Sequence, residues 1–232
     1  MIKFDIVTIF PKMFDSYFAE SIIKRAKDGK FIEIETHDLR DYTIDNHKTV
    51  DDTPYGGGAG MVMKVEPIYR AVSSIISKSQ FLISNEFSNS KISKPENTRI
   101  ILFAAKGKRY NQREAERLLQ YDNLIFLCGR YEGIDERVIE NIADEEISIG
   151  DFVLTGGEIP TMAVIDSLTR LIPGVLGNVE SIETESHSQD GYLEYPQYTK
   201  PEEFNGWKVP EVLLSGDHKK IQEWREKNSN KI

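Results

Sequence analysis

An apolar run that leads directly into a glycine-flanked charged cluster constrains the fold of this chain more than any other feature. Residues 123–128 read Asn-Leu-Ile-Phe-Leu-Cys, and residues 129–138 read Gly-Arg-Tyr-Glu-Gly-Ile-Asp-Glu-Arg-Val. A short apolar run bounded by glycine is typical of a buried parallel strand. Ligands of open α/β sheets bind beside the carboxyl ends of such strands, so the cluster is a candidate binding site. A solvated helix start held by ion pairs is the alternative, but it leaves Gly129 and Gly133 unexplained.

The rest of the pattern predicts an α/β protein with a parallel sheet, because strands alternate with helices along the chain. We expect one α/β domain over residues 1–176, a linker over 177–190 and a small helical domain over 191–232, with a surface insertion near 78–98. Strands are expected at 2–9, 31–39, 99–105, 124–128, 145–149 and 152–154, and helices at 14–26, 66–77, 111–120, 158–172 and 217–227.

Composition limits the location and the partners of the protein. No apolar stretch approaches the roughly 20 residues of a membrane span, and the first residues lack the layout of a signal peptide. The single cysteine, Cys128, suits a reducing cytosol, so we expect a cytoplasmic protein. The formal net charge of -9 argues against non-specific nucleic-acid binding but leaves room for a local basic face.

Several other segments have both a functional and a simpler interpretation. The glycine-rich segment 53–60 fits neither a P-loop nor a dinucleotide fingerprint, which favours a flexible or tightly turning loop. Residues 149–160 form a strand-to-helix turn whose backbone groups could read a purine, or an ordinary turn. Arg170 could simply pair with Asp166 one helical turn earlier. A solvated face or a phosphate-contacting stripe would explain the basic run of Lys106, Lys108, Arg109, Arg113 and Arg117.

Metal binding and nucleophilic catalysis have little support in the sequence. The four histidines are scattered and no Cys-x-x-Cys pair exists, which argues against a structural zinc site. No Gly-x-Ser-x-Gly elbow is present. Cys128 lies inside an apolar strand, where a packing role is expected.

Taken together, the motifs resemble those of one family, the bacterial tRNA (guanine-N1)-methyltransferases called TrmD, of the SPOUT class. The resemblance covers nearly the whole chain outside the insertion, and its motifs follow one another in a fixed order. The matching stretches are residues 9–14, 49–61, 128–138, 148–158, 165–177, 198–201, 212–216 and 222–225.

The resemblance implies a deep trefoil knot, a rare exception to the rule that chains are unknotted. It also implies S-adenosylmethionine bound by three knot loops and a homodimer whose active site is shared between one subunit's knot and the other's C-terminal domain. The loops correspond to residues 102–105, 129–133 and 149–160. The cofactor-binding residues implied are Leu102, Ala104, Ala105, Gly129, Tyr131, Glu132, Gly133, Ile149, Gly150, Phe152, Leu154, Gly156, Gly157 and Pro160.

The implied reaction is methylation of tRNA at N1 of the guanosine just 3′ of the anticodon, position 37. By resemblance, Arg170 stabilises charge on guanine O6 and Glu185 is the general base, with Asp190 as a nearby substitute. Magnesium is a possible aid near Glu132, but no compact acidic cage is visible, so no metal ligand is assigned.

Three departures from the family pattern support a rival hypothesis. Glu185 stands where the family has Asp, Ala104-Ala105 replaces Ser-Pro, and the chain stops soon after Trp224, where family members continue into a basic helical tail. The shorter tail should weaken the grip on tRNA. The rival is a catalytically impaired, knotted module that binds RNA or a nucleotide. A SPOUT enzyme acting on ribosomal RNA fits the order of the motifs less well.

Overall fold

The computed structural model describes residues 1–80, 92, 94–177 and 184–231. The chain divides into two compact units, Met1–Leu176 and Gly177–Ile232, and each is described by itself. Most of the expected insertion (81–91 and 93) and part of the expected linker (178–183) lie outside the described residues.

The first unit is built on a parallel sheet, as predicted. Its strand order is β2-β1-β6-β5-β7, and every neighbouring pair is parallel. All six residues of β6 are buried, because helices cover both faces of the sheet at this strand. The strands are β1 (Ile2–Thr8), β2 (Ile32–Asp38), β5 (Thr98–Arg109), β6 (Asn123–Cys128) and β7 (Glu145–Ser148).

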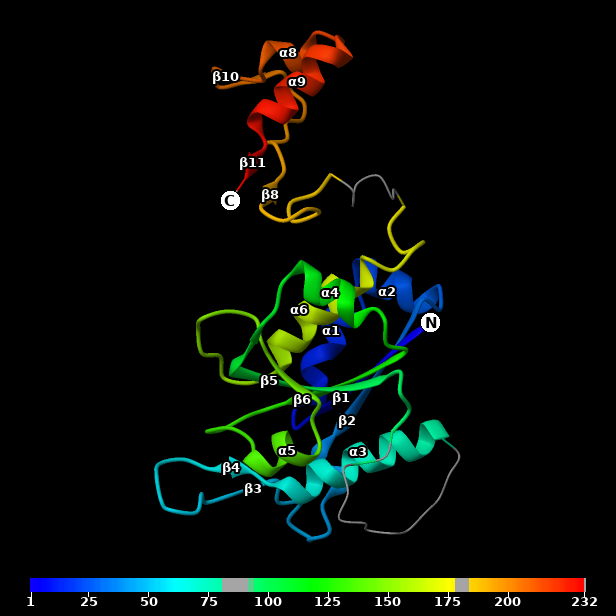
Figure 1. Cartoon of the computed structure of the whole chain (residues 1–232), viewed down its shortest axis with the longest axis vertical. Coiled ribbons are helices and arrows are strands. Elements are labelled where there is room, and N and C mark those ends of the chain that lie inside the picture. Colours follow the sequence, from blue (N-terminus) through cyan, green and yellow to red (C-terminus); the bar gives the residue numbers. More distant parts are fainter. Residues whose placement is uncertain (81–91, 93, 178–183, 232) are drawn as a thin grey trace. The chain divides into compact units, whose positions relative to one another are not determined.

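Two apolar cores lie on opposite faces of this sheet (Figure 1). One joins the sheet to α1, α2, α4 and α6 through residues such as Phe126 and Leu168. The other joins it to α3 and α5 through residues such as Ile125 and Val138. The helices are α1 (Asp15–Phe18), α2 (Ser21–Asp28), α3 (Val65–Gln80), α4 (Gln112–Leu118), α5 (Glu136–Asn141) and α6 (Glu158–Thr169).

Two expected elements differ in the structure. The helix expected over 14–26 is split into η1 (Pro11–Phe14), α1 and α2, and the backbone of Ser21 has φ 51°, which is incompatible with a continuous right-handed helix. The strand expected at 152–154 is absent, and these residues form a bent loop. Phe152 and Val153 are 54% and 85% exposed, so the sheet does not extend to them.

The glycine-rich segment contains a short antiparallel pair, β3 (Asp51–Asp52) and β4 (Val62–Met63). Gly56, Gly57, Gly58 and Gly60 all have positive φ, a conformation that glycine adopts at little cost. The interpretation as a tightly turning loop therefore agrees with the structure.

The second unit is small, and its described residues form two short antiparallel pairs and two helices. Trp224 packs edge-on against Tyr195 and Tyr198, and the Asp217 side chain caps α9 by accepting from the Lys220 backbone N–H at 3.2 Å. Among the described residues, no helix has the length and apolar character needed to cross a bilayer. The elements are β8 (Tyr192–Leu193) paired with β11 (Asn230–Lys231), β9 (Glu203–Phe204) paired with β10 (Trp207–Lys208), α8 (Glu211–Leu214) and α9 (His218–Asn228).

Candidate functional site

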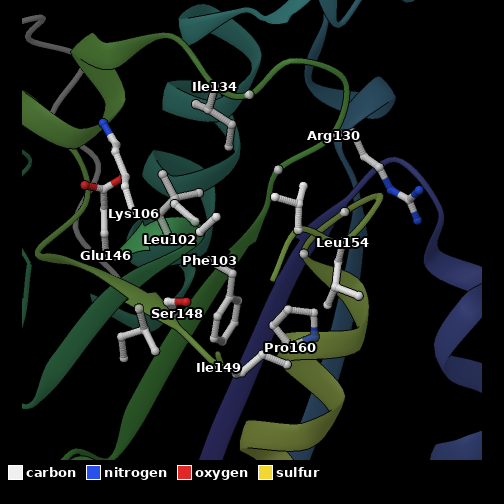
Figure 2. A pocket seen from close by; sticks show the side chains of 18 of the residues that line it. Leu102, Phe103, Lys106, Arg130, Ile134, Glu146, Ser148, Ile149, Leu154 and Pro160 are labelled. Carbon is white, nitrogen blue, oxygen red and sulfur yellow. The ribbon is translucent and has the colours of Figure 1, made fainter. Parts of the chain in front are cut away.

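A cavity of about 500 Å³ lies where the loops after β6 and β7 approach the middle of β5 (Figure 2). Leu102, Ile134, Leu154 and Pro160 supply apolar lining. All of the residues that the resemblance assigned to the cofactor line this cavity. They are Leu102, Ala104, Ala105, Gly129, Tyr131, Glu132, Gly133, Ile149, Gly150, Phe152, Leu154, Gly156, Gly157 and Pro160.

Close backbone packing holds the three cavity segments together. The Gly157 N–H donates to the Gly129 carbonyl oxygen at 2.9 Å, and a Cβ on Gly157 would lie 2.7 Å from the Cα of Cys128. A Cβ on Gly107 would lie 2.7 Å from the backbone of Ile147. Only glycine permits such close approaches, so these glycines let the three segments share one cavity.

The β3–β4 hairpin supports the loop over residues 129–133. Glu132 donates its backbone N–H to the Met61 carbonyl at 3.0 Å, and Met63 donates to the Gly133 carbonyl at 2.9 Å. A Cβ on Gly60 would lie 2.5 Å from the Glu132 side chain. The glycine-rich segment therefore positions a cavity loop, a role that its sequence alone did not indicate.

Charged side chains occupy one edge of the cavity. The Lys106 ammonium lies 2.9 Å from Glu136 and 3.7 Å from Glu146, and its hydrogen bond to Glu136 raises the pKa of Lys106. Glu146 Oε1 is buried and has no hydrogen-bond partner among the described residues. Figure 2 shows Lys106 and Glu146 together at this edge.

The remaining members of the basic run are all ion-paired with neighbouring carboxylates, which favours the salt-bridged surface over the phosphate-contacting stripe. The pairs are Lys108 with Glu114 at 2.5 Å, Arg109 with Asp151 at 3.1 Å, Arg113 with Glu116 at 2.7 Å, and Arg117 with Glu114 at 2.9 Å and with Glu145 at 2.7 Å.

The charged cluster after β6 is partly an ion-paired helix start and partly a wall of the cavity. Asp135 caps α5 by accepting from the Arg137 backbone at 3.0 Å, and it pairs with the Arg137 side chain at 2.6 Å. The hydrogen bond from Arg137 lowers the pKa of Asp135. This part of the cluster is a capped, ion-paired helix start, whereas Tyr131, Glu132 and Gly133 line the cavity.

The three candidate catalytic residues fall in different units. Arg170 lies in the first unit as the C-cap residue of α6, directly after Thr169, with helical backbone geometry. Glu185 and Asp190 lie in the second unit, where the Glu185 carbonyl accepts from the Ser188 backbone N–H at 3.0 Å. Their assembly into one catalytic site, and the choice between Glu185 and Asp190 as the base, stay predictions.

Among the described residues, neither a compact group of metal-ligating side chains nor an accessible thiol lies at the cavity. The one candidate group of metal ligands in the described part of the chain is Asp5, Glu35 and His37, none of which lines the cavity. The Lys3 ammonium lies 3.3 Å from Asp5 and 3.0 Å from Glu35, so it already supplies a cation. Cys128 is buried, and desolvation raises the pKa of its thiol, in agreement with a packing role.

The structure adds cavity residues that the sequence analysis did not assign to a ligand. Glu136 and Ile139 are one helical turn apart on α5, a spacing that could have indicated a common face. Glu146 and Ile147 precede the third predicted loop on β7. The added residues are Phe103, Lys106, Arg130, Ile134, Glu136, Ile139, Glu146, Ile147, Ser148, Val153 and Thr155.

Comparison with known proteins gives a consistent result along the whole chain. The family model described as tRNA (Guanine-1)-methyltransferase TrmD matches residues 2–232. A tRNA (guanine-N(1)-)-methyltransferase of Dictyoglomus turgidum is 51% identical over 231 residues, covering 100% of this chain and 86% of the relative. A protein of the same description from Clostridioides difficile is 50% identical over 230 residues, covering 99% and 93%.

A solved structure shows the same relationship. The tRNA (m1G37) methyltransferase of Aquifex aeolicus superposes with a TM-score of 0.75 and is 38% identical in sequence. The match covers 96% of this chain and 87% of that one.

Proposed function

The chain belongs to the TrmD family and is a tRNA (guanine-N1)-methyltransferase, and we propose that it transfers a methyl group from S-adenosylmethionine to N1 of guanosine 37, just 3′ of the anticodon. The observation that carries this proposal is the convergence on one cavity of all the residues that the resemblance assigned to the cofactor. The similar protein of Aquifex aeolicus is an m1G37 methyltransferase, which supports the choice of position.

The cavity fits a cofactor of this kind in size and lining. Its volume of about 500 Å³ is within the ~300–1,000 Å³ range of small-molecule sites. Apolar residues such as Leu102 and Leu154 can hold an adenine ring, and the backbone of the glycine-containing loops can hydrogen-bond to its edge. When bound, S-adenosylmethionine supplies a sulfonium-activated methyl group.

The catalytic work of the protein's own residues concerns the guanine. N1 carries a proton and is a poor nucleophile until that proton leaves, so a general base must accept it, and a carboxylate can do so. We assign this role to Glu185, with Asp190 as the alternative. As N1 loses its proton, negative charge grows on O6, where the guanidinium of Arg170 stabilises it. Magnesium enters only as an aid near Glu132.

We also propose how the parts of the chain are arranged and used in the assembled enzyme. The first unit carries a deep trefoil knot whose loops surround the cavity, and the enzyme works as a homodimer in the cytoplasm. Each active site combines the knot of one subunit with the C-terminal domain of the other. Residues 177–190 act as a linker and residues 191–232 bind tRNA.

Calorimetric titration with S-adenosylhomocysteine tests the cofactor assignment directly. Micromolar binding with one site per chain is expected. Absence of binding to a folded protein would contradict the assignment and favour a knotted module that binds RNA without using this cofactor.

A further inference from the structure

An ion pair joins two of the segments that line the cavity. Arg130 follows β6 and Glu158 begins α6, immediately after the loop over residues 149–157. The Arg130 Nε and Nη2 atoms each lie 2.9 Å from Glu158 Oε2. The side chain of Glu158 is 1% exposed and that of Arg130 is 16% exposed, so the pair is largely shielded from water.

The same carboxylate reaches the end of β1. The Thr8 hydroxyl donates to Glu158 Oε1 at 2.8 Å and accepts from the Phe10 backbone N–H at 3.0 Å. Both carboxylate oxygens of Glu158 are therefore bonded, one to Arg130 and one to Thr8. A buried carboxylate with complete partners holds the elements that supply them in a defined arrangement.

The guanidinium of Arg130 makes two further contacts. Its Nη1 atom donates to the Thr155 carbonyl oxygen at 3.2 Å, and its central carbon lies 4.8 Å from the centre of the Phe10 ring. Figure 2 shows the Arg130 side chain directed away from Leu102. Its charged end is thus held by Glu158, Thr155 and Phe10.

The local sequence leaves space for this pair. A Cβ on Gly156 would lie 2.2 Å from Arg130 Nε and 2.6 Å from Glu158 Oε2. Any other residue at this position would displace the guanidinium or the carboxylate. In the Gly156-Gly157-Glu158 sequence, the first residue therefore leaves space for the Arg130 side chain, the second allows the close contact between the loops, and the third pairs with Arg130.

We propose that Arg130 and Glu158 are positioning residues that lock the loops over residues 129–133 and 149–157 to each other and to the end of β1, and thereby preorganise the cavity for S-adenosylmethionine. The proposal rests on the proposed function of the cavity. A ligand that enters preformed loops loses less free energy to their ordering, so the lock acts on cofactor affinity more than on the methyl-transfer step.

Arg130→Lys tests the lock because lysine keeps the charge but loses the planar fork that reaches Glu158 and Thr155 together. We expect the Kd for S-adenosylhomocysteine to rise about tenfold through lost preorganisation, with kcat at saturating cofactor and the KM for tRNA changing by less than about threefold. Arg137→Lys is the matched control, since Arg137 also pairs with a carboxylate in this segment but lines no part of the cavity. Its Kd should equal that of the wild type.

Thr8 offers a second test that leaves the charges in place. Thr8→Val removes the hydroxyl bonded to Glu158 at similar volume and should weaken cofactor binding, whereas Thr8→Ser should restore it. All variants are measured well below their melting temperatures, so that loss of fold does not imitate loss of affinity. If a single variant does not fold, cofactor binding is measured instead on the double variant Arg130→Met with Glu158→Gln, which removes both charges.

The outcomes separate this proposal from the assignment of the cavity. If the wild type does not bind S-adenosylhomocysteine, the cavity assignment fails. If the wild type binds and the Arg130→Lys and Thr8→Val proteins bind equally well, the lock alone is wrong. A fall in melting temperature without a change in Kd would likewise show that the pair only stabilises the fold.

Discussion

Gly157 donates its backbone N–H to the carbonyl oxygen of Gly129 at 2.9 Å. This hydrogen bond joins the loop after β7 to the loop after β6, two segments separated in sequence by a helix and a strand. The contact brings the second and third cavity loops together, so the shape of the cavity depends on how closely these two backbones can approach.

Replacing Gly157 by alanine should disrupt this junction. The added Cβ would lie 2.7 Å from the Cα of Cys128, and backbone atoms at the end of a central strand cannot move without disturbing the sheet. We expect a loss of about 1–3 kcal/mol in the free energy of unfolding, together with weaker binding of S-adenosylhomocysteine. Urea denaturation and calorimetry measure the two effects.

Gly177→Ala is the matched control for this substitution. Among the described residues, no atom lies within 4 Å of a Cβ added there, so its stability and cofactor binding should stay close to those of the wild type. Equal behaviour of the two variants would show that the loops tolerate greater separation than the structure indicates.

Alanine substitutions at Gly60 and Gly56 separate the effect of contact with Glu132 from the effect of backbone strain. Both have positive φ, 82° and 84°, but only a Cβ on Gly60 meets Glu132, at 2.5 Å, while no atom of the described residues lies within 4 Å of a Cβ on Gly56. Alanine should cost each about 1 kcal/mol or more through the left-handed backbone. Only Gly60→Ala should also weaken cofactor binding, as calorimetry can establish. A similar loss of affinity in Gly56→Ala would point to strain alone.

The candidate catalytic residues should affect turnover more than cofactor affinity. Arg170→Ala should lower kcat by roughly 10²-fold or more through lost stabilisation of O6, with the Kd for S-adenosylhomocysteine unchanged. Glu185→Gln should lower kcat by roughly 10²–10⁴-fold if Glu185 is the general base. Single-turnover methylation of a tRNA transcript measures both.

Asp190→Asn is the companion variant for the choice of base. If it reduces the rate and Glu185→Gln does not, Asp190 takes the role. If neither changes turnover, the assignment of the base to this segment is wrong.

Asp135 should contribute to the loss of stability in acid. Its hydrogen bond with Arg137 lowers its pKa in the folded protein, so its contribution is present above the unfolded value of about 3.9 and is lost as the pH falls through the folded pKa. Arg137 is 61% exposed, so solvent screening limits the effect to about 1 kcal/mol or less.

Asp135→Asn tests this contribution, because asparagine can still cap α5. The unfolding free energy of the wild type should fall more between pH 5 and pH 2 than that of the variant. Parallel curves for the two proteins would exclude a contribution from this pair.

The sequence predicted the sheet because its signals are local, as in residues 124–128, which are continuously apolar. The three cavity segments were implied by the resemblance instead. Two of them, 129–133 and 149–160, contain glycines, whereas 102–105 contains none and lies inside β5 in the structure. The strand expected at 152–154 was wrong because Phe152 and Val153 are apolar yet exposed, and apolar character alone does not show which surface a side chain faces. The split before α2 was missed because Ser21 gives no sign of its positive φ.

The pairing of Arg130 with Glu158 could not be predicted for a different reason. Glutamate in the first turn of a helix is favoured at the surface by the helix dipole, so nothing local marks Glu158 as 1% exposed. Its burial depends on Thr8 and Arg130, which reach it only after β1 and β6 have paired in the sheet. The same applies to Gly60, whose need for glycine depends on the distant Glu132.

Methylation of a tRNA transcript with two guanosines at the 3′ edge of its anticodon, read by primer extension, tests the central claim most directly. The predicted result is a stop at guanosine 37 that requires S-adenosylmethionine and disappears when that guanosine is replaced by adenosine. Absence of a stop with folded protein that binds S-adenosylhomocysteine, or a stop that persists with adenosine at position 37, would contradict it.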